Sequence, residues 1–219
     1  MRVVGVRSLV TVTVLVAGLA TAGPAGAARP AVGRAPSPRV YKTAVVTRAG
    51  IVLRYPATWT VFPLTAKGLA AMERRVAKKD PDAVLAPAQQ ATAVRDDKFL
   101  AVDLESPGPT FRDNVSALVD DSTSLPSSLA DFQSTIASVW TPLGGTVVDT
   151  TSGTVRGETF YRADVTHPLT LLNGATVTTR VGQLVVAHGA GTTIVTVSAT
   201  DDPADVAVID QILGSVRPR

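Results

Sequence analysis

The sequence predicts an α+β fold, in which helices flank an antiparallel β-sheet, and three observations support this prediction. Short runs of β-branched and aromatic residues, separated by turn residues, recur between residues 41 and 200, which is typical of strands. Three other segments carry apolar residues at helical spacing. Asn173-Gly174 separates two late strand-like runs, and this dipeptide favours a two-residue hairpin whose strands are antiparallel.

Residues 1–28 have the layout of a secretory signal peptide. Arg2 and Arg7 supply a positive start, the apolar run SLVTVTVLVAGLA has 13 residues, and the small-residue tail TAGPAGAA follows. This order predicts export, with cleavage after Ala27 or Ala28. The run is shorter than the roughly 20 residues that span a bilayer, so a retained membrane anchor is the less favoured alternative. Residues 29–40 are a Pro/Ala/Arg-rich linker, and residues 41–217 are the expected folded domain.

The first half of the domain is expected to contain strands, a helix and two further strands. The runs KTAVVT, IVLRY and WTVF are strand-like and are separated by Gly50 and by PAT. Residues 66–79 predict a helix with Leu69, Met72 and Val76 on one face. The next two strand candidates are KFLAVDLES and NVSALVDD.

The second half is expected to contain a helix, a meander of strands and a last helix. SLPSSLADFQSTIASVW predicts a helix capped by Ser127 or Ser128. Its apolar side comprises Leu129, Phe132, Ile136, Val139 and Trp140. The strand candidates are TVVDTTSGTV, ETFYRADVTHPLTLL, ATVTTRVGQLVVAHG and TTIVTVSAT. Asp201, Asp202 and Pro203 open the last helix, whose apolar face holds Val206, Ile209, Ile212 and Leu213.

Composition excludes several classes of function. The whole chain holds 21 Lys and Arg against 18 Asp and Glu, a net charge of +3. Residues 1–28 contain two of the Arg and no acid, so without them the balance is 19 against 18. No electrostatic footprint for nucleic acid remains. The absence of cysteine excludes disulfides, thiolate metal sites, a cysteine nucleophile and a lipid carried on an N-terminal cysteine.

Four segments together point to a known family. They are GIVLRYPATW, KFLAVDLESPGPTFRDNVSALVDD, SLADFQSTIASVWTPLGGTVVDTTSGTVRGETFYRADV and IDQILGSVRP. In their order and spacing they resemble the PsbP-like family, which includes DcrB-type bacterial proteins and exported actinobacterial LpqN-type lipoproteins. The resemblance covers about residues 41–217. It implies an α/β/α sandwich and an exported envelope protein.

The chain departs from the LpqN-type lipoproteins because it has no cysteine to carry a lipid. The resemblance also assigns no metal, cofactor or photosystem contact to any residue of this chain, so we expect no cofactor. Lys is scarce relative to Arg, and Ala, Val and Thr are abundant. This composition fits a GC-rich bacterium, in agreement with the actinobacterial resemblance.

The sequence offers little that could perform catalysis. It contains no nucleophile elbow, no H-E-x-x-H motif, no Gly-rich phosphate loop and no S-x-x-K motif. His167, before Pro168, and His188, in a Gly-rich turn, are expected to be solvated turn residues. We therefore predict no catalytic residue and no enzymatic activity. A hydrolase site assembled from distant residues is the alternative.

We expect no metal site at the acidic pairs of the sequence. Asp96-Asp97, Asp120-Asp121 and Asp201-Asp202 lack the alternating oxygen ligands of a calcium loop and lie at the ends of expected elements. Helix capping is the favoured role for the last pair. Asn114-Val115-Ser116 matches a glycosylation acceptor but falls in an expected strand, so we interpret the match as incidental.

Arg74, Arg75, Lys78 and Lys79 form a basic cluster near the end of the first expected helix. They are the candidate binding residues, because such a cluster could meet an anionic envelope polymer or a membrane surface. The alternative interpretation is an ordinary solvated helix face, with cations placed favourably at the end of the helix dipole.

Residues 51–63 gather Tyr55, Trp59 and Phe62 around a proline. Exposed rings would suit a sugar-binding platform, but Ile51, Leu53 and Tyr55 alternate, as do Trp59 and Val61. We interpret the stretch as a hairpin that contributes to the core. Trp59 is then expected to pack against the helices, near Phe132, Ile136 or Leu213.

The sequence as a whole favours an exported, non-enzymatic protein that binds or assists another component of the envelope. The partner is an unidentified envelope protein, polymer or small ligand, and neither nucleic acid nor stable membrane insertion is expected. A secreted hydrolase is one alternative, and a purely structural or moonlighting surface protein is another.

Overall fold

The predicted segments form helices and strands in the expected order. The computed structural model describes residues 39–79, 97–105, 112–121, 124–170, 176–189 and 191–219. Its helices are α1 (Ala66–Lys79), α3 (Leu129–Trp140) and α4 (Pro203–Leu213), with single 3-10 turns η1 (Thr47–Ala49) and η2 (Thr141–Leu143). Its strands are β1 (Tyr41–Val46), β2 (Ile51–Pro56), β3 (Thr60–Val61), β4 (Asp97–Val102), β5 (Asn114–Asp120), β6 (Thr146–Val155), β7 (Glu158–Thr170), β8 (Thr176–His188), β9 (Gly191–Thr200) and β10 (Arg217–Pro218).

The strands form two antiparallel sheets rather than one. The larger sheet has seven strands in the order β3-β4-β5-β9-β8-β7-β6, and the smaller has three in the order β1-β2-β10. The predicted α+β class, with antiparallel strands and flanking helices, is confirmed. Asn173-Gly174, expected to form a hairpin turn, lies outside the described residues. The short strand β10, which pairs Arg217 with Val52, was not predicted.

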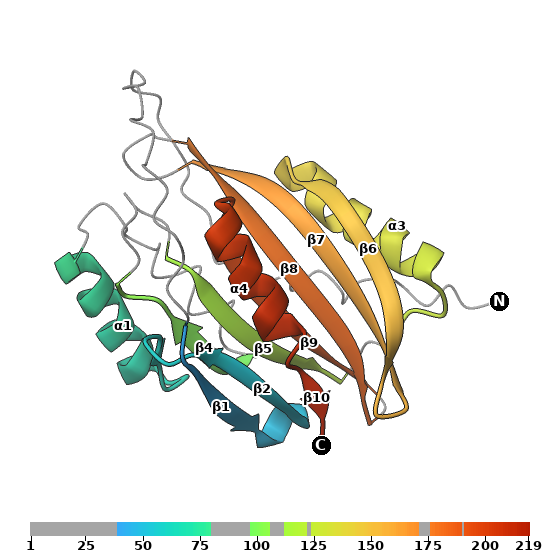
Figure 1. Cartoon of the computed structure of the whole chain (residues 1–219), viewed down its shortest axis with the longest axis horizontal. Coiled ribbons are helices and arrows are strands. Elements are labelled where there is room, and N and C mark those ends of the chain that lie inside the picture. The colour runs from blue at the N-terminus through green and yellow to red at the C-terminus, as the bar shows by residue number, and fades with distance from the viewer. Residues whose placement is uncertain (1–38, 80–96, 106–111, 122–123, 171–175, 190) are drawn as a thin grey trace.

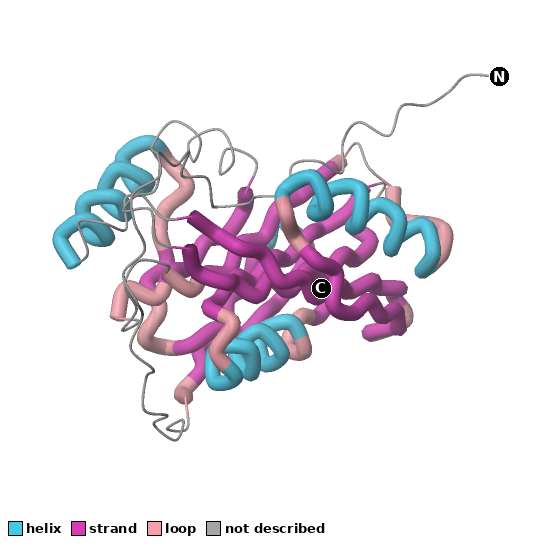
Figure 2. Tube along the Cα trace, turned by 90° about the horizontal axis from the view of Figure 1, so that it is seen from above, coloured by secondary structure: helices cyan, strands magenta, loops and turns pink. Residues whose placement is uncertain are grey.

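Three layers result from how the two sheets and the helices pack (Figures 1 and 2). Phe99 and Ala101 of β4 belong to the same buried cluster as β2 and α4. Leu100 and Val102 alternate with them along β4 and pack with α1. Because successive side chains of a strand point to opposite faces, the small sheet and α4 cover one face of the large sheet and α1 the other. Helix α3 packs on that second face, against β7 and β8.

Residues 51–63 are part of the core, as predicted, but they are not a hairpin. Strand β2 pairs with β1 and β10, whereas β3 pairs with β4, so the chain passes from one sheet to the other between them. The side chains of Tyr55, Trp59 and Phe62 are all buried. Val61, expected to point inward with Trp59, is 43% exposed, because β3 is a two-residue strand at the edge of the large sheet.

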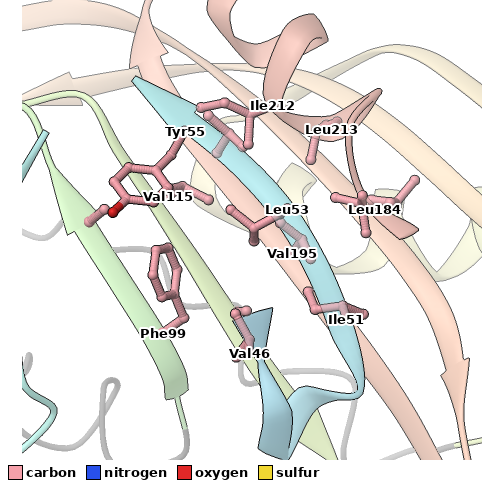
Figure 3. Packing of buried hydrophobic residues seen from close by; sticks show 14 of the residues in the cluster. Val46, Ile51, Leu53, Tyr55, Phe99, Val115, Leu184, Val195, Ile212 and Leu213 are labelled. Atoms are coloured by element: carbon pink, nitrogen blue, oxygen red, sulfur yellow. The ribbon is translucent and has the colours of Figure 1, made fainter. Parts of the chain in front are cut away.

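Trp59 is buried, as predicted, and belongs to the cluster that also contains Leu213 of α4. Phe132 and Ile136 lie on the opposite face of the sheet. Figure 3 shows this cluster, with Leu53 of β2 over Val195 of the large sheet and Leu213 close by. Removing such a cluster from water is the main source of stability for a chain without disulfides.

Local chemistry fixes where the helices begin. The Ser128 hydroxyl accepts a hydrogen bond from the Asp131 N–H at 3.1 Å, and the Asp202 carboxylate accepts one from the Ala204 N–H at 2.8 Å. Both predicted caps are therefore confirmed. Helix α4 approaches β8 closely at Gly182, where a Cβ would lie 2.4 Å from the Cγ2 of Ile209. Only glycine allows that contact between helix and sheet.

Candidate functional site

Helix α1 separates its apolar and basic side chains onto two sides. Met72 and Val76 are buried against the large sheet. Lys67, Arg74 and Lys78 are exposed, and their spacing of seven and four residues places them along one stripe on the solvent side. None of the three has an ion pair or a hydrogen bond in the part of the chain that the structure describes. We call these three residues the α1 stripe.

The structure describes the side chains of three of the four predicted binding residues, and these three differ in their contacts. Arg74 and Lys78 lie in the α1 stripe, but the Arg75 guanidinium lies 5.7 Å from the centre of the Phe62 ring. This cation–π contact gives Arg75 a role in covering the core. Lys79 is the last residue of α1, and its side chain lies outside the described structure. Lys67 was missed by the sequence analysis, although its distance of seven residues from Arg74 is a signal that could have found it.

His167 is buried rather than solvated, so that prediction was wrong. It lies within β7, and only 7% of its surface is exposed. Its ring lies 5.7 Å from that of Trp140, edge to face, and its Nε2 lies 3.0 Å from the carbonyl oxygen of Leu143. A carbonyl can only accept a hydrogen bond, so Nε2 carries the proton. Burial lowers the pKa of His167, and the bond to Leu143 opposes this. The neutral ring is thus a structural contact between β7 and η2.

A short chain of buried polar side chains lies beside this histidine. The Trp140 Nε1–H donates to the Gln183 Oε1 at 3.2 Å, and the Gln183 Nε2–H donates to the Thr196 hydroxyl at 3.3 Å. These bonds join α3 to β8 and β9 through the core. Because each buried donor meets an acceptor, the chain of bonds serves packing.

The two histidines lie far apart. His167 pairs with Thr179 of β8, and His188 is the last residue of that strand. Nine residues of strand separate Thr179 from His188, a distance of roughly 30 Å at about 3.4 Å per residue. The backbones of His167 and His188 therefore lie far apart along the sheet.

The acidic pairs also remain apart. Asp202 caps α4, Asp97 begins β4 and Asp120 ends β5, while Asp96 lies outside the described residues. No group of three or more His, Asp or Glu side chains could hold a metal ion in the described ranges. Asn114 is 4% exposed and donates a hydrogen bond to the carbonyl of Arg112, a position that leaves no room for a glycan.

Asp113 is a buried carboxyl group that the sequence analysis missed. It is 1% exposed and lies where β5 begins. The Thr200 N–H donates to its Oδ1 at 3.2 Å. Burial, reinforced by the charge of Asp205, raises the pKa of Asp113 from an ordinary 3.8 to about 8. Asp205 itself forms a salt bridge with Arg39 at 3.0 Å. The sequence gives no local sign of this burial, because Thr200 and Asp205 meet Asp113 only in the fold.

Comparisons with known proteins give a fold and no closer relationship. No protein-family model matches the chain, and no curated protein matches it. Among solved structures, the Ran-binding protein Mog1p of Saccharomyces cerevisiae superposes with a TM-score of 0.50 at 8% identity, over 83% of this chain and 96% of that one. The fold is of the Mog1/PsbP-like type. This agrees with the family resemblance seen in the sequence.

Two further structures of the Mog1/PsbP-like type are similar at lower scores. Cyanobacterial PsbP from Synechocystis has a TM-score of 0.48 at 13% identity, over 90% of this chain and 100% of that one. LpqN of Mycobacterium tuberculosis, described as involved in cell envelope biogenesis, has a TM-score of 0.40 at 12% identity, over 81% and 90%. A fold alone does not assign a function. Within the described residues, no helix has the length and hydrophobicity needed to cross a membrane.

Proposed function

We propose that this chain is an exported, non-enzymatic protein that acts as a binding or accessory module for another component of the cell envelope. The layout of residues 1–28 supports export. Mog1p, a protein described as Ran-binding, has the same fold, which supports a role in binding rather than in catalysis. The wide separation of the two histidines supports the same conclusion.

The α1 stripe is the observation that carries this proposal. Lys67, Arg74 and Lys78 lie on the solvent side of α1 and have no ion-pair partner among the described residues. A stripe of unpaired cations contributes little to the stability of the fold but attracts an anionic partner over several ångströms. We infer that the partner is an anionic component of the envelope, whether a protein, a polymer or a small ligand.

The test is affinity capture from envelope extracts with the chain that begins at Arg29, followed by mass spectrometry. The comparison variant is Lys67→Gln/Arg74→Gln/Lys78→Gln, which keeps the length and polarity of the side chains but removes three charges. We expect a partner that the parent retains at low salt and the variant does not. An equal yield with both proteins would show that the α1 stripe is an ordinary solvated face.

A hydrolytic activity of the purified chain would contradict the non-enzymatic part of the proposal. His188→Ala is the informative variant for that question, because His188 is the last residue of β8 and precedes a turn. His167→Ala is not informative, because the loss of a buried ring would disturb the fold. A specific turnover that His188→Ala abolishes would favour the secreted hydrolase instead.

A further inference from the structure

The three-stranded sheet and its flanking residues carry cationic side chains and no acidic side chain. Residues 39–62 and 214–219, which include β1, η1, β2 and β10, contain no Asp or Glu. Besides Arg39, which is paired with Asp205, the same segments contribute five exposed cations: Lys42, Arg48, Arg54, Arg217 and Arg219. Residues 63–213, by contrast, hold 11 Lys and Arg against 18 Asp and Glu. The fold therefore concentrates positive charge at this small sheet, although the chain as a whole is nearly neutral.

None of the five cations is neutralised by an ion pair in the described parts of the chain. The two acids of α4 that form ion pairs are already engaged, Asp205 with Arg39 and Asp210 with Arg162. Their pairing leaves the charge of the small sheet uncompensated at its border with α4.

Three of the arginines make contacts that hold their guanidinium groups in place without removing the charge. Arg54 lies over the ring of Tyr41, with 5.6 Å between the guanidinium carbon and the ring centre. Arg217 donates to the carbonyl of Gly214 at 2.7 Å, and Arg219 donates to the Thr47 hydroxyl at 3.4 Å. Several N–H donors of each fork stay available to a ligand.

Register places part of this charge on the outer face of the sheet. Ile51 and Leu53 are buried against the large sheet, so Val52 and Arg54 point the other way. Arg217 of β10 and Val45 of β1 both pair with Val52 of β2, so they point to the same outer side as Val52. Val45 is 56% exposed. The outer face thus combines arginines with exposed valine.

We propose that the outer face of the three-stranded sheet docks the protein onto an anionic lipid surface. Guanidinium groups donate paired hydrogen bonds to phosphate, and four of the five cations are arginines. Each cation near an anionic bilayer strengthens binding about fivefold, from a contribution of about 1 kcal/mol. This docking surface is separate from the α1 stripe and does not depend on the function proposed for it.

A lipid surface fits these residues better than a soluble anionic polymer does. The 56% exposed Val45 on this face gains nothing from a polyphosphate chain, whereas at a headgroup boundary its apolar surface is removed from water. The outward-facing charge is also spread over two strands, with Arg54 on β2 and Arg217 on β10, and is not confined to one row. An extended basic face with some apolar area matches a lipid surface better than a single polymer chain.

The experiment measures binding of the chain that begins at Arg29 to vesicles of equal parts phosphatidylglycerol and phosphatidylcholine, by sedimentation. The test variant is Arg48→Gln/Arg54→Gln/Arg217→Gln. Lys42 is left unchanged, because it pairs with the buried Tyr55 and so lies toward the inner side of the sheet. The matched control is Lys67→Gln/Arg74→Gln/Lys78→Gln, which removes the same charge from the α1 stripe. Circular dichroism and thermal melting verify that both variants are folded. We expect the test variant to bind about a hundredfold more weakly and the control to change only a few-fold.

Three further measurements can each overturn the proposal. Raising the salt from about 0.1 M to about 1 M shortens the Debye length from ~10 to ~3 Å and should release the protein from the vesicles. Val45→Thr, which keeps the shape and removes apolar surface, should weaken vesicle binding a few-fold. Equal loss in the two triple variants, equal binding to pure phosphatidylcholine, or binding to inorganic polyphosphate without binding to vesicles would refute docking on lipid through this sheet.

Discussion

Asp113 should make the fold less stable as the pH rises, and Asp113→Asn should abolish this effect. The carboxyl group is 1% exposed and receives one hydrogen bond, from the Thr200 N–H. That environment favours the neutral acid, since burial and the nearby charge of Asp205 raise the pKa from 3.8 to about 8. Asn is neutral at every pH, has nearly the same shape and can still accept the bond from Thr200.

The sign follows from the raised pKa in the folded state. Below about pH 4 the carboxyl group is protonated in both the folded and the unfolded chain, so it costs nothing. Between 3.8 and about 8 the unfolded chain releases the proton more readily, and stability is lost progressively. The difference between the two pKa values corresponds to at most about 6 kcal/mol, at roughly 1.4 kcal/mol per pKa unit. Because a buried site relaxes and admits water when it ionises, we expect roughly 2–4 kcal/mol.

The assay is urea unfolding of the parent and of Asp113→Asn at several pH values from 4 to 9. The difference between their free energies of unfolding isolates Asp113, because all other titrating groups are shared. We expect similar stabilities near pH 4 and a variant more stable by a few kcal/mol near pH 9. Carbon NMR of the Asp113 carboxyl group would measure its pKa in the folded chain directly.

Asp131→Asn provides a control of opposite sign. Hydrogen bonds with the Ser127 and Ser128 side chains lower the pKa of Asp131 from its ordinary 3.8, so its contribution is present above pH 3.8 and is lost only at more acid pH. The difference between parent and Asp131→Asn should therefore stay constant from pH 4 to 9 and shrink below that range. A difference between parent and Asp113→Asn that stays constant from pH 4 to 9 would refute the argument. A difference that grows towards acid pH would show that Asp113 is a charged partner in the fold.

The remaining predictions concern the core, a buried histidine and export. Trp59→Ala should lower the free energy of unfolding by about 3–5 kcal/mol, because the indole is 4% exposed within the main cluster; melting like the parent would contradict this. The pKa of His167 is lowered, so its neutral ring should stabilise the fold above pH 6.5, and this stability should fall on acidification. Acid unfolding of the two proteins should show this loss of stability in the parent and not in His167→Gln. Mass spectrometry of the exported chain should find an N-terminus at Ala28 or Arg29, and an intact Met1 would contradict cleavage.

Elements and caps could be predicted from the sequence because they depend on neighbours along the chain. The apolar spacing of Met72 and Val76, or the position of Ser128 before α3, is local information. The positions of α1 and α3, and the order of the strands along the chain, could be predicted from this local information. The burial of Trp59 could be predicted as well, because a large apolar ring in an alternating run favours the face of the strand that is buried.

Pairing between distant segments could not be predicted in this way. Nothing local shows that β2 and β3, four residues apart, belong to different sheets, or that Arg217 pairs with Val52. The burial of His167 had the same cause, because it depends on contacts with Trp140 and Leu143 in another part of the chain. A histidine before proline looks like a turn residue until the contacts with the end of α3 and with η2 are known.

The distribution of charge depends on the same long-range pairing. Net charge counts residues wherever they lie, and over residues 41–219 it is close to zero, with 16 Lys and Arg against 18 Asp and Glu. Folding pairs Arg217, at the end of the chain, with Val52, two residues from Arg54, and brings Arg219 to Thr47, the neighbour of Arg48. A basic surface can therefore form on a chain whose composition excludes a generally basic protein.

The two basic surfaces lie on opposite sides of the large sheet, and this arrangement makes the two proposals compatible. The small sheet shares a buried cluster with Phe99 of β4, and α1 shares one with Leu100 of the same strand, so the intervening strand separates them. A molecule docked on lipid through the small sheet would hold the α1 stripe away from the bilayer. Lys67, Arg74 and Lys78 would then be free to meet a second anionic component. Charge removed from one surface should leave the other functional, because roughly a sheet and a helix, more than a Debye length of about 10 Å, lie between them.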